Sequence, residues 1–87
     1  MEISFLRGNM GTTAMNSSVM FGAVVDGLNV KCEISKEALK KHFGSRSDNE
    51  FDLLKAFEKG RVRIEEVART RLTANSTRRC LMMSSHF

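Results

Sequence analysis

Residues 19–35 read VMFGAVVDGLNVKCEIS, and this stretch decides the fold because its polarity alternates on both sides of Asp26-Gly27. Asp-Gly is typical of the two-residue type I′ turn, in which both central residues take a positive φ. With the turn placed there, residues opposite each other on the two strands share one face of a hairpin. The apolar pairs are Val25–Leu28, Ala23–Val30, Phe21–Cys32 and Val19–Ile34; the other face pairs Val24–Asn29, Gly22–Lys31 and Met20–Glu33. The sequence therefore predicts a β-hairpin over residues 18–34.

A short helix is predicted directly after the hairpin, over residues 36–43. Ser35 is a good N-cap because its hydroxyl can accept a hydrogen bond from a free backbone N–H of the first turn. Gly44 is well placed to end the helix in a left-handed conformation. Ala38, Leu39 and Phe43 are the side chains available for packing.

A second, longer helix is predicted over residues 48–73. The sequence SDNE at 47–50 has the form of a capping box and precedes an apolar stripe close to a 3.6-residue period. That stripe consists of Leu53/Leu54, Phe57, Ile64, Val67/Ala68 and Leu72. Gly60 interrupts it at a cost of about 1 kcal/mol relative to Ala, so we expect a tight contact or a kink there.

The ends of the chain are expected to complete the sheet. The apolar run near the C-terminus predicts a strand over residues 79–84, and residues 3–5 either form another short strand or cover an edge. Residues 8–17 are small and polar and are expected to form a loop. The predicted fold class is α+β, with a small antiparallel sheet built on the hairpin and two helices packed against it.

Size and composition predict one domain, residues 1–87, of the ordinary soluble type. The N-terminus lacks the basic start and the apolar run of a signal peptide, and no segment is apolar for long enough to cross a bilayer. Two cysteines are too few for a disulfide framework, so we expect two free thiols in a reducing cytoplasm.

Three groups of residues resemble a known family. The family is that of short bacterial proteins known as domain of unknown function 1488, and the resemblance covers roughly residues 3–72. The residues that carry it are Phe21, Val25-Asp26-Gly27 and Val30 to Ser35, then Glu37 to Leu39 with His42 to Gly44, then Ala56-Phe57, Arg61, Ile64-Glu65 and Ala68. The resemblance implies a small α+β bacterial protein, and it brings no established activity, cofactor or catalytic residue.

Metal, nucleophile and cofactor chemistry are not expected at the cysteines and histidines. Cys32 and His42 lie ten residues apart and Cys80 and His86 six apart, whereas zinc sites usually bring ligand pairs two to five apart. Cys32 also lies on the apolar face of the hairpin, where a free cysteine behaves as a small hydrophobe. The glycines match no phosphate-binding or dinucleotide pattern, so no cofactor is predicted and an enzyme is not expected.

The arginines offer a nucleic-acid hypothesis. Residues 61–87 hold six arginines against Glu65 and Glu66, a net charge of +4, and this equals the excess of the whole chain. The candidate contacts are Arg61, Arg63, Arg69, Arg71, Arg78 and Arg79. Against this reading, the spacing of Glu65 from Arg61 and Arg69 is that of a salt-bridged helix face, and the chain has no Tyr or Trp to stack on bases.

The methionines favour protein binding. Met20 and Val24 are predicted on the outer face of the hairpin, and Met82 and Met83 cannot both face inward on one strand. These four residues are the candidate interface with an unknown protein partner or a second copy, unless a helix covers that face. The sequence thus predicts a non-enzymatic protein-interaction or regulatory module, with a nucleic-acid-binding protein as the alternative and no membrane partner.

Overall fold

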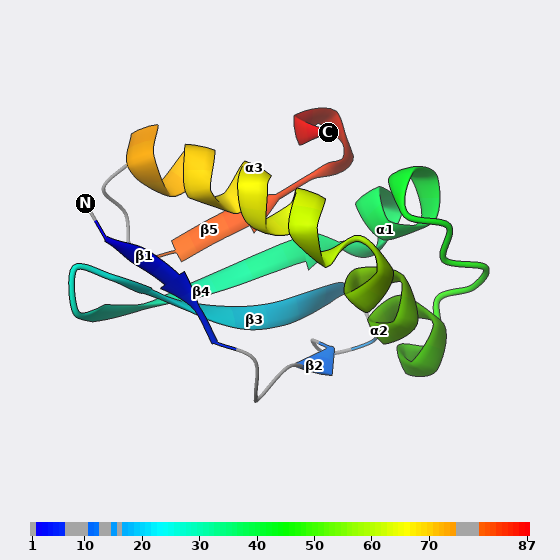
Figure 1. The fold of residues 1–87 in the computed structure, drawn as a ribbon. Helices are drawn as coiled ribbons and strands as arrows, with labels where there is room; N and C mark the ends of the chain where they lie inside the picture. Colours follow the sequence, from blue (N-terminus) through cyan, green and yellow to red (C-terminus); the bar gives the residue numbers. More distant parts are fainter. Residues whose placement is uncertain (1, 7–10, 13–14, 16, 75–78) are drawn as a thin grey trace.

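A computed structural model describes residues 2–6, 11–12, 15, 17–74 and 79–87 (Figure 1). Within these residues the fold is α+β, with a five-stranded sheet and three α-helices. The elements are β1 (Ile3–Phe5), β2 (Gly11–Thr12), β3 (Ser18–Val25), β4 (Leu28–Ser35), α1 (Lys36–His42), α2 (Glu50–Lys59), α3 (Arg61–Ala74), β5 (Arg79–Met82) and the 3-10 turn η2 (Ser84–His86).

The hairpin of β3 and β4 has the predicted register. Each of the seven predicted pairs, from Val25–Leu28 to Val19–Ile34, is a partner pair of the antiparallel ladder. Asp26 and Gly27 have φ values of 50° and 85°, as the type I′ turn requires. One prediction about its faces needs correction, because Leu28 is 56% exposed beside the turn.

The sheet is mixed, which corrects the prediction of an antiparallel one. Its strand order is β1-β3-β4-β5, with β2 also paired to β3, and β5 runs parallel to β4. The chain leaves β4, passes through all three helices and then returns along β4, and such a crossover permits parallel pairing. The last strand ends at Met82 rather than at residue 84 because the chain turns into η2.

The N-terminal segment contributes both short strands on the β3 side of the hairpin. The strand predicted at residues 3–5 is present as β1, paired antiparallel with Val25 to Ala23. Residues 11–12, which were predicted as part of a loop, form β2 by pairing with Met20 and Val19. Backbone pairing to an open edge does not depend on apolar side chains, so a polar segment gave no signal.

The short helix α1 has the predicted caps. The Ser35 hydroxyl accepts a hydrogen bond from the Ala38 N–H at 3.2 Å, and Gly44 follows the helix with a φ of +75°. The N-cap of α2 is Asn49, not Ser47, so the predicted capping box is wrong. Asn49 accepts from the Asp52 N–H at 2.8 Å, while the Ser47 hydroxyl donates to the Asp52 carboxylate at 2.7 Å.

The predicted long helix is two helices, α2 and α3, separated at Gly60. Gly60 ends α2 with a φ of −99°, a value that other residues also adopt. A Cβ atom at Gly60, however, would lie 2.5 Å from Cε1 and 2.9 Å from Cγ of Phe43. The tight contact and the break in the helix, offered above as alternatives, therefore both occur at this glycine.

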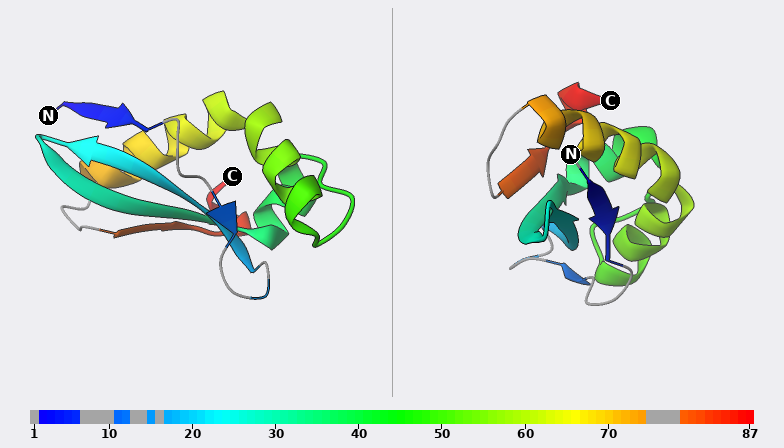
Figure 2. Two further views of the ribbon diagram at one scale, coloured as in Figure 1. Left: turned by 90° about the horizontal axis from the view of Figure 1, so that it is seen from below. Right: turned by 60° about the vertical axis from the view of Figure 1, so that its left-hand side comes forward.

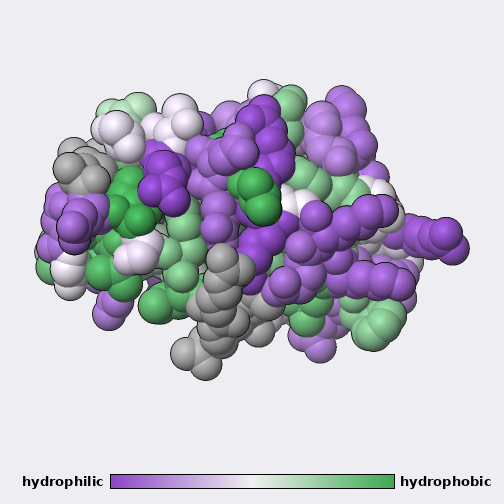
Figure 3. Space-filling model, in the orientation of Figure 1, coloured by the Kyte–Doolittle hydropathy of each residue, from purple (hydrophilic) through white to green (hydrophobic). Residues whose placement is uncertain are grey.

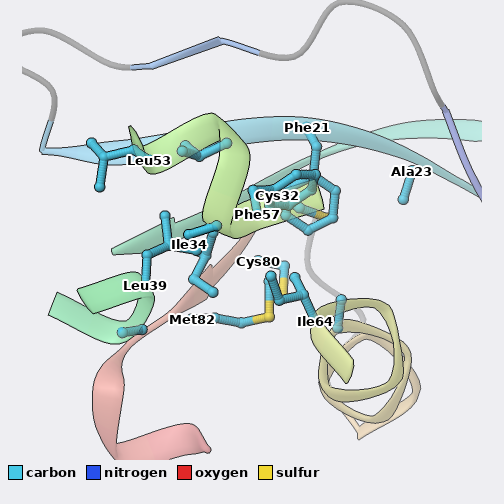
Figure 4. Close-up of a cluster of buried hydrophobic side chains, with 14 of the residues drawn as sticks. Phe21, Ala23, Cys32, Ile34, Leu39, Leu53, Phe57, Ile64, Cys80 and Met82 are labelled. Carbon is cyan, nitrogen blue, oxygen red and sulfur yellow. The ribbon is translucent and has the colours of Figure 1, made fainter. Parts of the chain in front are cut away.

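The core lies between the sheet and the helices. Figure 2 shows α2 and α3 over one face of the sheet, and α1 closes one end of it. The labelled side chains in Figure 4 converge on this space from β3, β4, β5 and the three helices. The buried apolar side chains are Val19, Phe21, Ala23, Val30, Cys32, Ile34, Ala38, Leu39, Leu53, Ala56, Phe57, Ile64, Ala68, Leu72, Cys80 and Met82.

Candidate sites: the outer sheet face, the helix arginines and a thiol pair

The outer face of the sheet is the face opposite α2 and α3, and no helix within the described residues covers it (Figure 2). Alternation along β3 places Met20 and Val24 there, as predicted, and both are half-buried. The register of β5 places Leu81 beside Glu33 on the same face, where it is 44% exposed. Apolar side chains therefore lie on both sides of Glu33 on this face, at Met20 on β3 and at Leu81 on β5.

Met82 does not belong to this surface. It is completely buried and contributes to the core, so the candidate interface loses this residue and gains Leu81. Met83, just beyond β5, is 43% exposed. The reasoning that Met82 and Met83 cannot both face inward holds, but the direction and register of a parallel strand could not be predicted, and these decide which residue points outward.

Leu6 extends the apolar part of the outer face. It follows β1, is 44% exposed and donates its N–H to the Gly22 carbonyl at 2.9 Å. Its side chain lies directly over Gly22, where a Cβ atom would come within 2.9 Å of Leu6 Cδ1. This contact could not be predicted from the sequence, because it depends on where β1 joins the sheet.

Charged residues alternate with the apolar ones on the outer face. Lys31 and Glu33 are two residues apart on β4 and so lie on one face, with Lys31 exposed and Glu33 half-buried. Lys31 pairs with Gly22 on one side and Arg79 on the other, and Glu33 lies between Met20 and Leu81. The face thus carries one cation and one anion at its centre, flanked by apolar side chains.

The arginines of α3 do not form one face. At about 100° per residue, neighbouring arginines are about 80–120° apart around the helix axis, in the order Arg61, Arg69, Arg63 and Arg71. Figure 3 shows α3 within a hydrophilic surface on which apolar patches are scattered. Arg78 lies outside the described residues, as does the side chain of Arg79.

Arg61 is a structural residue rather than a surface cation. It is 5% exposed, and its guanidinium donates to Glu65 at 2.7 Å, to Glu58 at 3.1 Å and to the Leu6 carbonyl at 2.9 Å. It also lies over the Phe57 ring, 5.2 Å from the centroid. A phosphate could reach this guanidinium only if these bonds broke, so a nucleic-acid contact at Arg61 is not supported.

The other helix arginines are partly engaged. Arg69 is exposed, donates to the Ile3 carbonyl at 3.5 Å and lies 5.5 Å from the Phe5 centroid. Arg63 is exposed and pairs with Glu66 at 3.6 Å. Arg63 and Arg71 line an open pocket of about 320 Å³, whose other lining residues are Glu66, Val67, Thr70 and His86.

A second hollow, of about 360 Å³, lies between the end of α1 and the outer side of α2. Arg46, Lys55 and Lys59 line it together with Asp52, and Phe43 forms part of its apolar wall. The Asp52 carboxylate accepts hydrogen bonds from Ser47 and Asn49, so the three cations dominate the charge of this hollow. Sequence reasoning missed it because its lysines and Arg46 come from two separate segments.

Cys32 and Cys80 form a buried thiol pair on neighbouring strands. They are register partners of β4 and β5, exposed by 0% and 4%, and both are free thiols. A hydrogen bond from Cys32, together with the nearby Arg71 guanidinium, lowers the pKa of Cys80 to about 7 against the opposing effect of burial. The same hydrogen bond, burial and the charge of Cys80 raise the pKa of Cys32.

Arg71 connects this thiol pair to the surface. Its guanidinium interacts with the Cys80 sulfur, and it also lines the pocket that contains His86. Its Nε atom is buried and has no hydrogen-bond partner within the part of the chain that the structure describes. Sequence reasoning identified both cysteines and this arginine but did not bring them together, because only the parallel register of β5 does so.

Within the described residues, no group of three or more His, Cys, Asp or Glu side chains is placed to bind a metal ion. The three helices of the same residues include none with the length and apolarity to span a bilayer.

Comparison with known families matches residues 3–82 to the family described as "Protein of unknown function (DUF1488)". The chain belongs to this family. The match includes β1 to β5, and so both the outer sheet face and the Cys32–Cys80 pair lie within the DUF1488 region. Met83 and His86 lie beyond it.

No curated protein and no solved structure matches the chain. The structure confirms the predicted α+β fold, and membership of the DUF1488 family carries no activity with it. Any functional proposal must therefore come from the residues themselves.

Proposed function

We propose that this DUF1488 chain is a non-enzymatic protein-interaction module that self-associates through the outer face of its sheet. The observation that supports it is the presence of the exposed side chains of Leu6 and Leu81 and the half-buried Met20 on a sheet face that no helix of the described residues covers. Exposed apolar patches often mark interaction sites. Two free buried cysteines fit a reducing compartment such as a bacterial cytoplasm.

A second copy of the chain fits this face because the face is self-complementary. In the proposed dimer, the outer faces of two sheets stack, and the two-fold axis runs between them, perpendicular to the strands and level with Cys32 of β4. Such an axis places Lys31 of one copy opposite Glu33 of the other, and the same pair forms twice. It also places Met20 opposite the Gly22 position, which Leu6 covers, so that apolar side chains meet there, and it places Leu81 opposite the Arg79 position.

The dimensions of the sheet predict a modest interface. Four strands about 4.8 Å apart, with at most eight residues at about 3.3 Å each, give a face no larger than about 500 Å². Two copies would bury about 1,000 Å² in total, which lies near the lower limit for a specific interface. We therefore expect a reversible dimer that dissociates on dilution.

Charge reversal tests the two-fold arrangement directly. Lys31→Glu or Glu33→Lys alone would place like charges opposite each other and should shift the dimer to monomer in sedimentation velocity across a concentration series. The double variant Lys31→Glu/Glu33→Lys restores opposite charges and should dimerise like the original chain. Failure of the double variant to recover, with circular dichroism showing it folded, would contradict this arrangement.

The apolar side chains of the outer face are tested with a matched pair of variants. Leu81→Lys introduces a charge on the outer face and should abolish self-association. Val62→Lys introduces the same charge at a residue that is 75% exposed on α3, and it should leave the dimer intact. The proposal is overturned if the chain stays monomeric up to about 1 mM, since weaker association is negligible.

Nucleic-acid binding through the arginines is the alternative, and a salt series distinguishes it. A protein that binds phosphates releases counterions, so its affinity for mixed DNA and RNA must fall steeply with salt. Arg63→Ala should then reduce the salt slope by about 1. Absence of binding at low salt would remove this alternative, whereas salt-sensitive binding that survives Leu81→Lys would favour it over self-association.

A further inference from the structure

The Cys32–Cys80 pair has the strand geometry for an intramolecular disulfide. In-register residues on neighbouring strands have Cα atoms about 4.8 Å apart, within the range of about 4.4–6.8 Å that disulfides span. Both side chains point to the core face of the sheet (Figure 4), and a hydrogen bond joins the two thiols. Neither strand has to reverse its face or shift its register for a bond to form.

The surroundings of the two thiols differ, and this assigns them different chemical roles. Cys80 lies beside the Arg71 guanidinium, which stabilises a thiolate, and Cys32 donates a hydrogen bond to it. Cys32 has no exposed surface. Since the thiolate is the nucleophile, Cys80 is the attacking sulfur and Cys32 the resolving one.

We propose that Cys80 is an oxidation site for small hydroperoxides and that Cys32 resolves it to a Cys32–Cys80 disulfide. The Cys80 thiolate attacks the peroxide oxygen, the O–O bond breaks, and the alkoxide or hydroxide that leaves takes up a proton. The product is a sulfenic acid at Cys80. The Cys32 sulfur then attacks the Cys80 sulfur, and hydroxide leaves as water with the Cys32 proton. The two thiols are oxidised by two electrons, and the peroxide is reduced to an alcohol, or to water, with one further water released.

Arg71 supports both steps of this sequence. Its charge holds the thiolate before attack, and its buried Nε–H, which has no hydrogen-bond partner among the described residues, is available to an oxygen atom added to the Cys80 sulfur. The same residue also lines the open pocket beside His86, so it lies between that pocket and the Cys80 sulfur. A thiol that is 4% exposed admits a small peroxide more readily than a bulky disulfide reagent.

The resulting disulfide should be easy to reduce. Cβ atoms of in-register parallel partners are separated by about the strand spacing of 4.8 Å, whereas disulfides prefer about 3.5–4.5 Å. Closing this gap requires β5 to move toward β4, and β5 is the edge strand of the described sheet. Strained disulfides have higher reduction potentials, so a dithiol should restore both thiols.

Intact mass spectrometry of the full chain treated with hydrogen peroxide tests the proposal. We expect the loss of two hydrogen atoms, simultaneous loss of both thiols from an alkylation assay, and one peptide pair linked between Cys32 and Cys80. Dithiothreitol should reverse all three. The proposal is overturned if both thiols survive peroxide that oxidises free cysteine, or if the only disulfide formed joins two chains.

Single variants separate the attacking sulfur from the resolving one. Cys32→Ser should stop at a sulfenic acid on Cys80, which a sulfenic-acid-specific carbon nucleophile traps. Cys80→Ser should lose its remaining thiol at least about tenfold more slowly, because Cys32 has no exposed surface and burial still raises its pKa after Cys80 is removed. Equal rates in the two variants, with both folded by circular dichroism, would refute the assignment.

A third pair of variants tests Arg71 without touching either sulfur. Arg71→Met should slow the oxidation of Cys80 and move its pH dependence upward, because the charge that favours the thiolate is gone. Arg69→Met removes an equal charge from the side of α3 that faces β1, and it should change neither quantity. An unchanged pH profile in Arg71→Met would contradict the role given to this arginine.

Discussion

Replacing Gly60 with alanine should destabilise the fold, although ordinary helix arguments predict the opposite. The φ of Gly60 is −99°, which alanine adopts freely, so the change should reduce the entropy of the unfolded chain and stabilise by about 0.4–1 kcal/mol. The new Cβ, however, would lie 2.5 Å from Cε1 and 2.9 Å from Cγ of Phe43. The whole Phe43 ring must therefore move, because both Cγ, where the ring joins the side chain, and Cε1 on its edge lie too close to the new Cβ.

The Phe43 ring cannot move without loss. It packs edge-to-face on Phe87 with the centroids 5.2 Å apart, a contact worth about 0.5–1.5 kcal/mol. Overpacking typically costs a further 1–3 kcal/mol. Set against the gain from alanine, Gly60→Ala should lower the free energy of unfolding by about 1–3 kcal/mol. For a domain of this size the melting temperature should fall by about 5–20 °C.

Urea and thermal unfolding followed by circular dichroism measure this effect, and a double-mutant cycle assigns it to the ring. In a Phe43→Ala background the obstructing atoms are absent, so Gly60→Ala should become neutral or stabilising by up to about 1 kcal/mol. A rise in melting temperature for Gly60→Ala alone would refute the steric reasoning. So would an equal loss in both backgrounds, because the cost would then belong to the backbone.

Three further changes follow from burial and charge. Arg61→Met should lower the free energy of unfolding in urea by about 2–4 kcal/mol, because it leaves Glu65, Glu58 and the Leu6 carbonyl without their buried partner. An unchanged urea midpoint would contradict this. Alkylation of Cys80 should be half-maximal near pH 7 rather than near the ordinary 9.0, because Cys32 donates a hydrogen bond to it and the Arg71 guanidinium lies beside it. Between pH 7 and 9 the folded thiol has released its proton and the unfolded one has not, so stability should rise with pH over this range. Met82→Ala should cost about 2–5 kcal/mol by calorimetry, whereas Met83→Ala should stay within about 0.5 kcal/mol.

The local elements were predictable because their signals lie within a few residues. The Asp26-Gly27 turn fixes the hairpin register, and every other pair follows from a period of two. Ser35 lies one residue before α1 and caps it through its own hydroxyl. For the same reason the outer-face positions of Met20 and Val24 were predictable, since they depend only on the hairpin.

The remaining features depend on contacts distant in the chain. The direction of β5 is set by how three helices return the chain to β4, and no local signal encodes it. The burial of Arg61 requires the Leu6 carbonyl, 55 residues away. Charge counting treated six arginines as one group, but the four on α3 point in different directions around the helix, and only the packing of β1 and β5 against it places Arg69 beside β1 and Arg71 beside Cys80.

The short strand β5 connects the two proposals through its alternation. Cys80 and Met82 point to the core and Leu81 to the outer face, so a partner bound over Leu81 also holds the strand that covers Cys80. Binding that favours the closed strand lowers the population of any locally opened state. If peroxide reached Cys80 by opening of β5, self-association would slow its oxidation. Entry past Arg71 makes the access of peroxide to Cys80 independent of the partner, because the pocket that Arg71 lines is on the helix side of the sheet. The disulfide step still requires β5 to move toward β4, so a partner bound over Leu81 should slow disulfide formation by either route.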